Sequence, residues 1–455
     1  MNHTTERADK VVEELTVQFG KMLRKWVYDN SESETATLNE LEDAVRGGLH
    51  SLGNKVLQGL IEVVGTGKRA DSVPCPQCGE SMAFVRYQGK WVQTLLGTIR
   101  PERAYFHCAK CRKGHVPLDH QLGLGADSLS GGLEEAFCLL AARMPLEEAA
   151  DTLQRLLLLQ VDDNTVQRAV LRVGSELADL QERRAEQAWQ RAQPPKMEVD
   201  EPPERLYITV DGTTAHLQEG WKEVKIAAIY ETEQVSQPDG SIDVRAVHIT
   251  YVVSFEDAQT FARHVYLEAA RRGLEHAQEV VVLGDGAEWI WNRIARFCDR
   301  PVEIVDFYHG TEHVWNAGQA LYGEGTEETE QWVTQRLEEL LEQGPEALLA
   351  SLWTASTGTT ATVKSILGRE INYFDKHKQR MQYPQLRAAG YHIGSGSVES
   401  ACKRIIGARL KQAGMIWTRE GAQAVAHLRA SVLCNRWDAF WISYDRTTRT
   451  FRPAA

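Results

Sequence analysis

The stretches Tyr207-Ile208-Thr209-Val210-Asp211-Gly212-Thr213 and Val281-Val282-Leu283-Gly284-Asp285-Gly286 decide the fold predicted for this chain. Each begins as a short apolar run, which predicts a buried strand, and each reaches an aspartate followed by glycine. Glycine lets the chain turn sharply and leaves the preceding carboxylate accessible. Because the carboxyl ends of neighbouring strands converge in α/β sheets, Asp211 and Asp285 are predicted to meet at one edge.

The segments around these stretches alternate between strand and helix patterns. After the strand over 206–210 come two further strands, an amphipathic helix, a strand, a helix and a last strand, which lie at 225–230, 246–253, 255–272, 280–283, 288–298 and 302–305. This order is the one expected of a ribonuclease H-like sheet, an analogy at the level of fold. Residues 311–390 interrupt it with a mostly helical, acidic segment. The predicted catalytic core therefore comprises 205–310 and 391–441, with 311–390 as an all-helical insertion.

The size and charge of the chain set limits on its class. With 455 residues it is long enough for about three domains, and its 43% apolar residues suffice for a sizeable core. Its apolar runs fall short of the roughly 20 residues that cross a bilayer, and its first residues lack the pattern of a secretory signal. We therefore expect a cytoplasmic protein without a membrane partner. The net charge of −12 contrasts with the basic excess usual for nucleic-acid binders, so contact with DNA requires a local basic face.

The segments before the core change character three times. Residues 1–70 carry apolar residues at helical spacing, 71–120 contain short alternating segments around cysteines, and 130–192 return to a helical pattern. The Pro-Pro pairs within 193–204 predict a linker.

Two Cys-x-x-Cys pairs predict a metal site in the segment 71–120. The ligands are Cys75 with Cys78 and Cys108 with Cys111. Four thiolates complete a tetrahedron around Zn²⁺ and leave no open position, which indicates a structural zinc ribbon. A redox dithiol is the alternative for such pairs.

The helical segment 130–192 resembles a helix-turn-helix. One helix follows Pro145, a turn lies near Asp162, and a second helix follows. Four polar residues on the second helix are placed to reach bases or phosphates: Thr165, Gln167, Arg168 and Arg172. An ordinary helical hairpin is the alternative.

A third acidic residue, Glu399, lies in Gly394-Ser395-Gly396-Ser397-Val398-Glu399-Ser400. The Gly-Ser stretch is typical of a helix entry and places Glu399 in the first helical turn. Four basic residues on the continuing helix are candidates for contact with a DNA backbone: Lys403, Arg404, Arg409 and Lys411. A capped surface helix with solvated charges is the alternative.

These pieces together resemble DDE transposases of bacterial insertion sequences. The blocks that carry the resemblance contain Asp211, Asp285-Gly286-Ala287-Glu288-Trp289 and Glu399, and the zinc ribbon belongs to the same pattern. The resemblance implies a metal-binding triad of Asp211, Asp285 and Glu399 on a ribonuclease H-like core. It further implies two Mg²⁺ (or Mn²⁺) ions, strand cleavage at element ends and joining to target DNA, with double-stranded DNA as partner. A homodimer or higher homo-oligomer is implied because such enzymes pair two ends.

The run Asp306-Phe307-Tyr308-His309 resembles the Asp-x-x-His element of Mutator-like transposases. That likeness implies accessory roles for Asp306 and His309 near the scissile phosphate. A strand-end aspartate and a helix-start histidine are the alternative.

Two other functions stay open at this level. His309-Gly310-Thr311-Glu312-His313 matches the H-x-x-E-H pattern of zinc peptidases. A non-catalytic, sequence-specific DNA-binding regulator, or an inactive transposase relic, would use the ribbon and the helical pair alone and would not require the three acids to converge.

Overall fold

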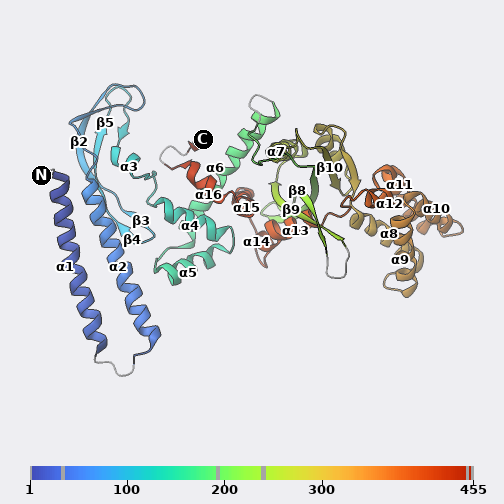
Figure 1. The fold of residues 1–455 in the computed structure, drawn as a ribbon, viewed down its shortest axis with the longest axis horizontal. Helices are drawn as coiled ribbons and strands as arrows, with labels where there is room; N and C mark the ends of the chain where they lie inside the picture. Colours follow the sequence, from blue (N-terminus) through green and yellow to red (C-terminus); the bar gives the residue numbers. More distant parts are fainter. Residues whose placement is uncertain (1–2, 32–35, 191–194, 237–241, 447–449, 452–455) are drawn as a thin grey trace. The chain divides into compact units, whose positions relative to one another are not determined.

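The computed structural model describes residues 3–31, 36–190, 195–236, 242–446 and 450–451. The chain forms two compact units (Figure 1), of which unit 1 comprises Met1–Glu176 with Arg436–Ala455 and unit 2 comprises Leu177–Asn435. The division falls inside helix α6 (Asp163–Trp189), before the predicted linker at 193–204, of which residues 191–194 lie outside the described part. Within the described residues, no helix combines the length and the apolarity that crossing a membrane requires.

Unit 1 begins with a long helical hairpin. Helix α1 (His3–Ser31) packs along α2 (Leu38–Val64), as Figure 1 shows. Thr37 begins α2 with a capping box, in which its hydroxyl accepts from the Glu40 amide while the Glu40 carboxylate accepts from the Thr37 amide. Small residues of α2 make room for α1, because the ring of Trp26 occupies the space above Gly48.

The cysteine-rich segment of unit 1 is a small antiparallel sheet. Its strand order is β1-β2-β5-β6, with bounds Ser72–Pro74, Ser81–Gly89, Glu102–His107 and Gly114–His115. Met82, Ala104 and Phe106 are fully buried between its strands. The hairpin of β3 (Val92–Thr94) and β4 (Gly97–Ile99) is paired separately and packs on α2.

The remainder of unit 1 is helical and includes the end of the chain. Its elements are α3 (Pro117–Gln121), α4 (Gly131–Ala141), α5 (Leu146–Leu157), the start of α6, α16 (Trp437–Ser443), β12 (Tyr444–Asp445) and β13 (Thr450–Phe451). Tyr444 donates to Glu176, and Arg446 pairs with the buried Glu134. Through these contacts the residues after 435 belong to unit 1. The sequence pattern had instead predicted that the catalytic core extends to residue 441.

Unit 2 is built on a five-stranded mixed sheet with the order β11-β10-β7-β8-β9. The strands are β7 (Arg205–Leu217), β8 (Gly220–Ser236), β9 (Ile242–Ser254), β10 (Glu279–Gly284) and β11 (Val302–Val305). The first three form an antiparallel meander, and β10 and β11 run parallel to β7. Helix α7 (Ala258–Arg271) precedes β10 and packs against β8 and β9.

Helices separate the last strand from the end of unit 2. They are α8 (Phe307–Tyr322), α9 (Glu327–Glu342), α10 (Pro345–Ser356), α11 (Ala361–His377), α12 (Tyr383–Ala388), α13 (Gly396–Ala401), α14 (Ala408–Leu410) and α15 (Arg419–Leu433). The helices α8 to α12 occupy the predicted insertion and contact one another. The Tyr383 hydroxyl donates to the carbonyl of Val305 at 2.9 Å and fixes α12 to the end of β11.

Candidate functional site

The register of the sheet places Asp211 and Asp285 on the same row. Thr209 of β7 pairs with Leu283 of the parallel strand β10, and each aspartate follows two residues later. The Asp285 carboxylate accepts from the Ala287 amide at 2.8 Å, which closes the turn that leaves β10. The two carboxylates therefore come from neighbouring strands at one level, as the strand pattern predicts.

Asp306 joins this row from the other side of β10. Gly284 pairs with Val305 of β11, so Asp285 and Asp306 both lie one residue past a paired position. The Asp306 amide donates to the carbonyl of Gly284 at 2.8 Å, which extends the ladder beyond the strand. Three adjacent parallel strands thus carry an aspartate at the same edge.

Asp211 lies inside its strand, because β7 continues to Leu217. Its carboxylate accepts from the Gly212 amide at 2.7 Å and lies 3.6 Å from Sγ of Cys402. Burial raises the pKa of Asp211, and the charge of Asp285 adds to this rise while His309 opposes it. Asp211 therefore belongs to one electrostatic cluster with Asp285 and His309.

The carboxylate of Asp306 accepts four hydrogen bonds. Its carboxylate caps α8 by accepting from the amides of Tyr308 and His309, both at 3.2 Å. It also accepts from the Ser395 amide at 2.9 Å and from the Ser395 hydroxyl at 2.7 Å. Burial raises the pKa of Asp306, and these hydrogen bonds oppose that rise. Its position fixes His309 in the first turn of α8.

Ser395 connects Glu399 to this edge. Its hydroxyl lies 2.7 Å from Asp306 and 3.1 Å from Oε1 of Glu399. Glu399 is in the short helix α13, as the Gly-Ser stretch predicts, and its other oxygen lies 3.9 Å from Nζ of Lys403. The structure therefore brings Asp211, Asp285, Asp306, His309 and Glu399 into one region of unit 2.

The three acids of the triad do not close into a tight cage. Within the described residues, only the four-cysteine group has ligand atoms that all lie within 4.8 Å of one another.

Helix α11 supports the turn that carries Asp285. The Tyr373 hydroxyl donates to the carbonyl of Asp285 at 3.0 Å. Gly286 has a φ of 97°, and a Cβ there would lie 3.3 Å from both Tyr373 Oη and His377 Nε2. A side chain at Gly286 would be strained by the backbone and crowded by α11. The sequence pattern did not reveal Tyr373 or His377, because only the tertiary fold brings α11 to this turn.

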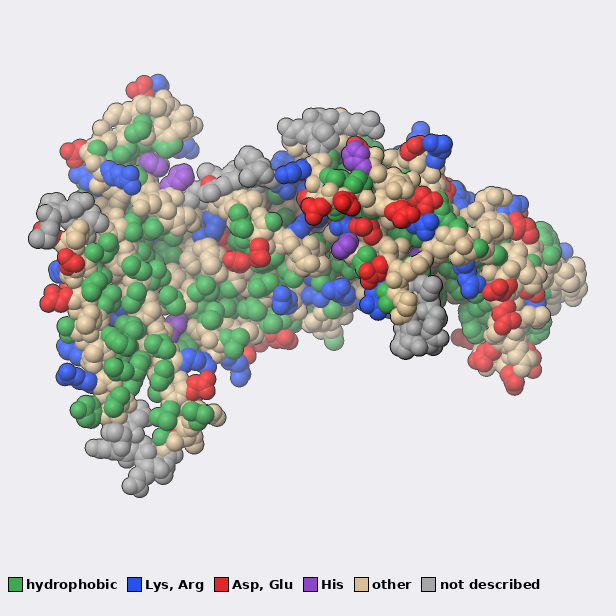
Figure 2. Space-filling view, in the orientation of Figure 1, with side chains coloured by type: hydrophobic (Ala, Val, Ile, Leu, Met, Phe, Trp, Pro, Cys, Tyr) green, Lys and Arg blue, Asp and Glu red, His purple; other side chains and the backbone are tan. Residues whose placement is uncertain are grey.

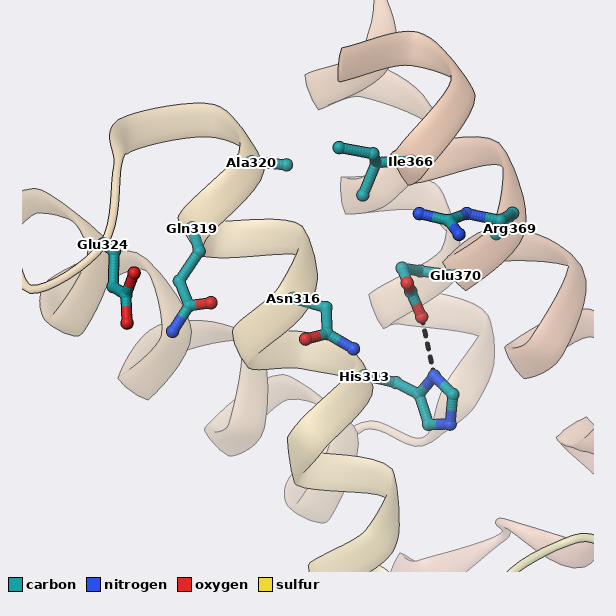
Figure 3. Close-up of a pocket in the computed structure, with 8 residues that line it drawn as sticks. All are labelled: His313, Asn316, Gln319, Ala320, Glu324, Ile366, Arg369 and Glu370. Carbon is teal, nitrogen blue, oxygen red and sulfur yellow. Dashed lines mark hydrogen bonds and ion pairs between the residues drawn. The ribbon is translucent and has the colours of Figure 1, made fainter. Parts of the chain in front are cut away.

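A pocket of about 650 Å³ lies between α8 and α11 (Figure 3). His313, which ends the H-x-x-E-H run, lines it; its Nδ1 lies 2.6 Å from the Glu370 carboxylate, and its ring stacks on Tyr373 with centroids 3.5 Å apart. Asn316, Gln319 and Arg369 add further polar groups to the lining. His313 is thus engaged by α11, and His309, Glu312 and His313 do not form a metal-binding group in the described part of the chain.

The four cysteines of unit 1 form a second candidate site. Cys75, Cys78, Cys108 and Cys111 gather as the spacing predicts, and Sγ of Cys78 lies 3.7 Å from Sγ of Cys108. A tetrahedral zinc site with Zn–S bonds of about 2.3 Å has sulfur separations of about 3.8 Å. Backbone amides of Cys78 and Gln77 lower the pKa of the Cys75 thiol to about 7, whereas hydrogen bonding to Cys78 and burial raise the pKa of the Cys111 thiol. The donor set fits a metal ion that prefers sulfur.

The predicted helical pair of unit 1 corresponds to α5 and α6. Thr165 and Arg168 lie in the first turns of α6, where Thr165 is half-buried and Arg168 is exposed. The Asp162 carboxylate accepts from the Thr165 amide at 2.7 Å, and the Arg168 guanidinium donates to the Thr165 hydroxyl at 2.9 Å. Gln167 is also exposed. Arg172 is different, because it pairs with the buried Glu134 and lies 3.2 Å from Asp127.

The four basic residues after Glu399 separate into two groups. Lys403 is exposed, Arg404 lies 3.3 Å from the Tyr251 hydroxyl, and Lys411 donates to Thr213 on β7 at 2.6 Å. Arg409, in contrast, is fully buried over the ring of Trp417, so it is a core residue and not a candidate for contact with DNA. The predicted continuous helix is interrupted by a π-helical turn over Cys402–Gly407, which redirects the side chains that follow.

Residues 32–436 match a family described as Uncharacterised protein family (UPF0236). The chain belongs to this family. The matched range includes the cysteine cluster, the whole mixed sheet, the helical insertion and Glu399. No curated protein matches the chain.

Proposed function

We propose that this protein is a DNA transposase whose Asp211, Asp285 and Glu399 form a DDE-type site on a ribonuclease H-like core. One observation carries the proposal: the register of β7 and β10 aligns Asp211 with Asp285, while Ser395 links Glu399 to the same edge. The strand order supports the ribonuclease H-like assignment, because an antiparallel meander is extended on one side by two parallel strands.

The charges of the site fit divalent metal ions. The pKa of Asp211 is raised by burial and, to a smaller extent, by the charge of Asp285, so a cation bound between these groups would relieve an unfavourable concentration of negative charge. Mg²⁺ or Mn²⁺ would be held by Asp211, Asp285 and Glu399 and would supply activation of water and stabilisation of the leaving 3′ oxygen.

The remaining residues position the DNA and the acids. Asp306 accepts from the amide of His309 and from the hydroxyl of Ser395, so it fixes His309 relative to β11 and holds Ser395 beside Glu399, whose Oε1 lies 3.1 Å from the same hydroxyl. Lys403 and Lys411 offer positive charge beside the site, and Lys411 is held there by Thr213. These local charges offset an overall charge of −12, which otherwise disfavours contact with a polyanion.

The cysteine cluster is proposed to bind structural Zn²⁺, because four thiols gathered in this way leave no open coordination position. With Thr165, Gln167 and Arg168 on α6, it supports a role for unit 1 in holding element ends.

A strand-cleavage assay tests the proposal. The purified chain is incubated with Mg²⁺ or Mn²⁺ and labelled duplexes taken from the DNA on either side of its own gene. We expect metal-dependent nicking that Asp285→Asn reduces at least a hundredfold. The matched control is Asp299→Asn, because Asp299 is 89% exposed and lies in the same unit. If Asp285→Asn cleaves as fast as the control, the triad is wrong.

A DNA-binding regulator is the second candidate, because in the described residues the three acids do not form a group of candidate metal ligands as the four cysteines do. It predicts duplex binding by the unmodified chain without cleavage under any metal condition. Binding that survives Asp285→Asn, in the absence of cleavage by either protein, would assign the chain to this class.

A further inference from the structure

The helical hairpin of unit 1 carries an apolar stripe that nothing in the described residues covers. On α1 this stripe consists of four apolar residues, Val12 (62% exposed), Phe19 (39%), Leu23 (45%) and Val27 (58%), with the exposed polar residue Thr16 between the first two. Their spacing of three and four residues keeps them on one side of the helix. The stripe is separate from the side that packs on α2, where Val11 lies over Gly59 and Trp26 over Gly48.

Helix α2 adds exposed apolar residues to the same hairpin. They are Leu38 (77%), Val45 (45%) and Leu49 (52%), again at helical spacing. Figure 2 shows hydrophobic side chains gathered along both helices of the hairpin on one face. We call the stripe of α1 together with Leu38, Val45 and Leu49 the hairpin face. Contiguous apolar surface of this kind usually marks an interaction site.

The α1 stripe is symmetric about its centre. Val12 and Val27 lie seven residues before and eight residues after Phe19, and Thr16 and Leu23 lie three before and four after. An antiparallel copy of α1 would therefore place Val12 beside Val27 and Thr16 beside Leu23, with the two Phe19 rings at the two-fold axis. A two-fold contact requires such a self-complementary surface.

The charges beside the stripe have nearly the same centre, one residue nearer the start of α1 than the centre of the pairs above. Glu13 precedes Phe19 by six residues and Arg24 follows it by five, and both lie on the same flank of the stripe at helical spacing. In an antiparallel pair this flank of one copy faces the same flank of the other, so each Glu13 lies near the Arg24 of the other copy, whereas a parallel two-fold pair would place the two flanks on opposite sides of the contact. This complementarity points to a second copy of the chain as the occupant.

We propose that the hairpin face is covered by the hairpin face of a second copy, so that two hairpins form an antiparallel four-helix bundle. The packing of apolar stripes at three- and four-residue spacing is the one that holds such bundles together. The inference does not depend on the catalytic triad, since every residue that carries it lies in α1 and α2.

The test is sedimentation equilibrium of the full chain over a range of concentrations. We expect a dimer whose dissociation constant rises at least tenfold in Phe19→Glu. The matched control is Val17→Glu, because Val17 is 52% exposed on the same helix but lies off the stripe. Far-UV circular dichroism of both variants reports whether α1 still folds. A monomeric parent protein, or equal effects of the two substitutions, would overturn the proposal.

A charge exchange tests the orientation without changing the apolar surface. Glu13→Arg and Arg24→Glu should each weaken the dimer on the order of fivefold, as exposed ion pairs allow, and the double variant should recover the parent affinity. Failure of the double variant to recover would overturn the antiparallel arrangement. The parent protein is also mixed with anionic phospholipid vesicles; if it binds them as a monomer and Phe19→Glu does not, the occupant is a membrane surface and the proposal is wrong.

Discussion

The hydroxyl of Tyr373 donates a 3.0 Å hydrogen bond to the backbone carbonyl of Asp285. These residues are 88 positions apart and belong to α11 of the helical insertion and to the turn after β10. The contact shows that the insertion supports the acidic edge of the sheet. Lys376, one turn further along α11, reinforces it by pairing with Glu288 at 2.6 Å.

Removing this hydroxyl should affect the site more than the fold. Tyr373→Phe loses one hydrogen bond, so we expect the free energy of unfolding to fall by about 1 kcal/mol. Because the turn carrying Asp285 loosens, metal-dependent cleavage should fall by roughly tenfold, the cost of about 1.4 kcal/mol in the barrier. Urea unfolding and the cleavage assay measure the two effects.

Tyr391→Phe is the matched control for that change. Its hydroxyl donates to Glu279 at 2.6 Å, at the opposite end of β10. We expect a similar loss of stability without the loss of cleavage. Equal cleavage rates in the two variants would contradict a positioning role for Tyr373.

Two arginines on α6 should differ in what they do. Arg172 pairs with Glu134, which is 1% exposed, so Arg172→Ala leaves a buried carboxylate with one partner fewer, and unfolding should become easier by about 3 kcal/mol. Arg168 is exposed, so Arg168→Ala should change stability by less than about 0.5 kcal/mol. Thermal unfolding measures both.

Measurements of duplex binding should also distinguish Arg168 from Arg172. Arg168→Ala should weaken binding and reduce the salt dependence of affinity by about one unit of slope, as expected for one lost phosphate contact. An unchanged salt dependence would remove Arg168 from the DNA-binding surface.

Acid should destabilise unit 2 through His427. Burial lowers the pKa of this histidine to about 3 in the folded chain, and the nearby His264 adds to the effect. Above the ordinary pKa of about 6.5 both folded and unfolded chains hold a neutral ring, so the full stability is present. As the pH falls from there toward 3, only the unfolded chain takes up the proton, and stability is lost.

The size of this effect can be measured by substitution. Between pH 7 and pH 4 the parent should lose about 3 kcal/mol through His427, a loss that His427→Gln removes even though the variant is less stable at pH 7. Urea unfolding at the two pH values gives the difference. His276 is exposed, and His276→Gln should keep the parent's pH dependence. If His427→Gln lost as much stability between pH 7 and pH 4 as the parent protein, the His427 ring would not be the cause of the pH dependence.

We expect the cysteine cluster to bind zinc and unit 1 to require that zinc for binding duplex DNA. In the double variant Cys75→Ser with Cys108→Ser, we expect loss of the bound zinc, measured by elemental analysis, and loss of duplex binding. The control is Cys298→Ser, because Cys298 belongs to unit 2 and is not one of the four clustered cysteines. Duplex binding that persists without zinc would contradict a role of the ribbon in holding DNA.

Local patterns determined much of this protein. The Cys-x-x-Cys pairs predicted that four cysteines gather in one cluster, and the apolar runs before Asp211 and Asp285 predicted two strands inside the sheet. Periods of two and of three to four residues report directly which face of a strand or helix is buried, so these predictions needed no long-range information. Strand ends were less well defined, since β7 continues past Asp211 to Leu217.

Only the tertiary structure decided which residues meet. Arg409 and Lys411 both follow Glu399 on a basic segment, yet a π-helical turn buries Arg409 against Trp417 and leaves Lys411 beside Thr213. Likewise, Ser395 joins Asp306 to Glu399, although no periodic pattern relates them. A sequence pattern records the solvent exposure of each residue, whereas a hydrogen bond between distant residues depends on how whole elements pack.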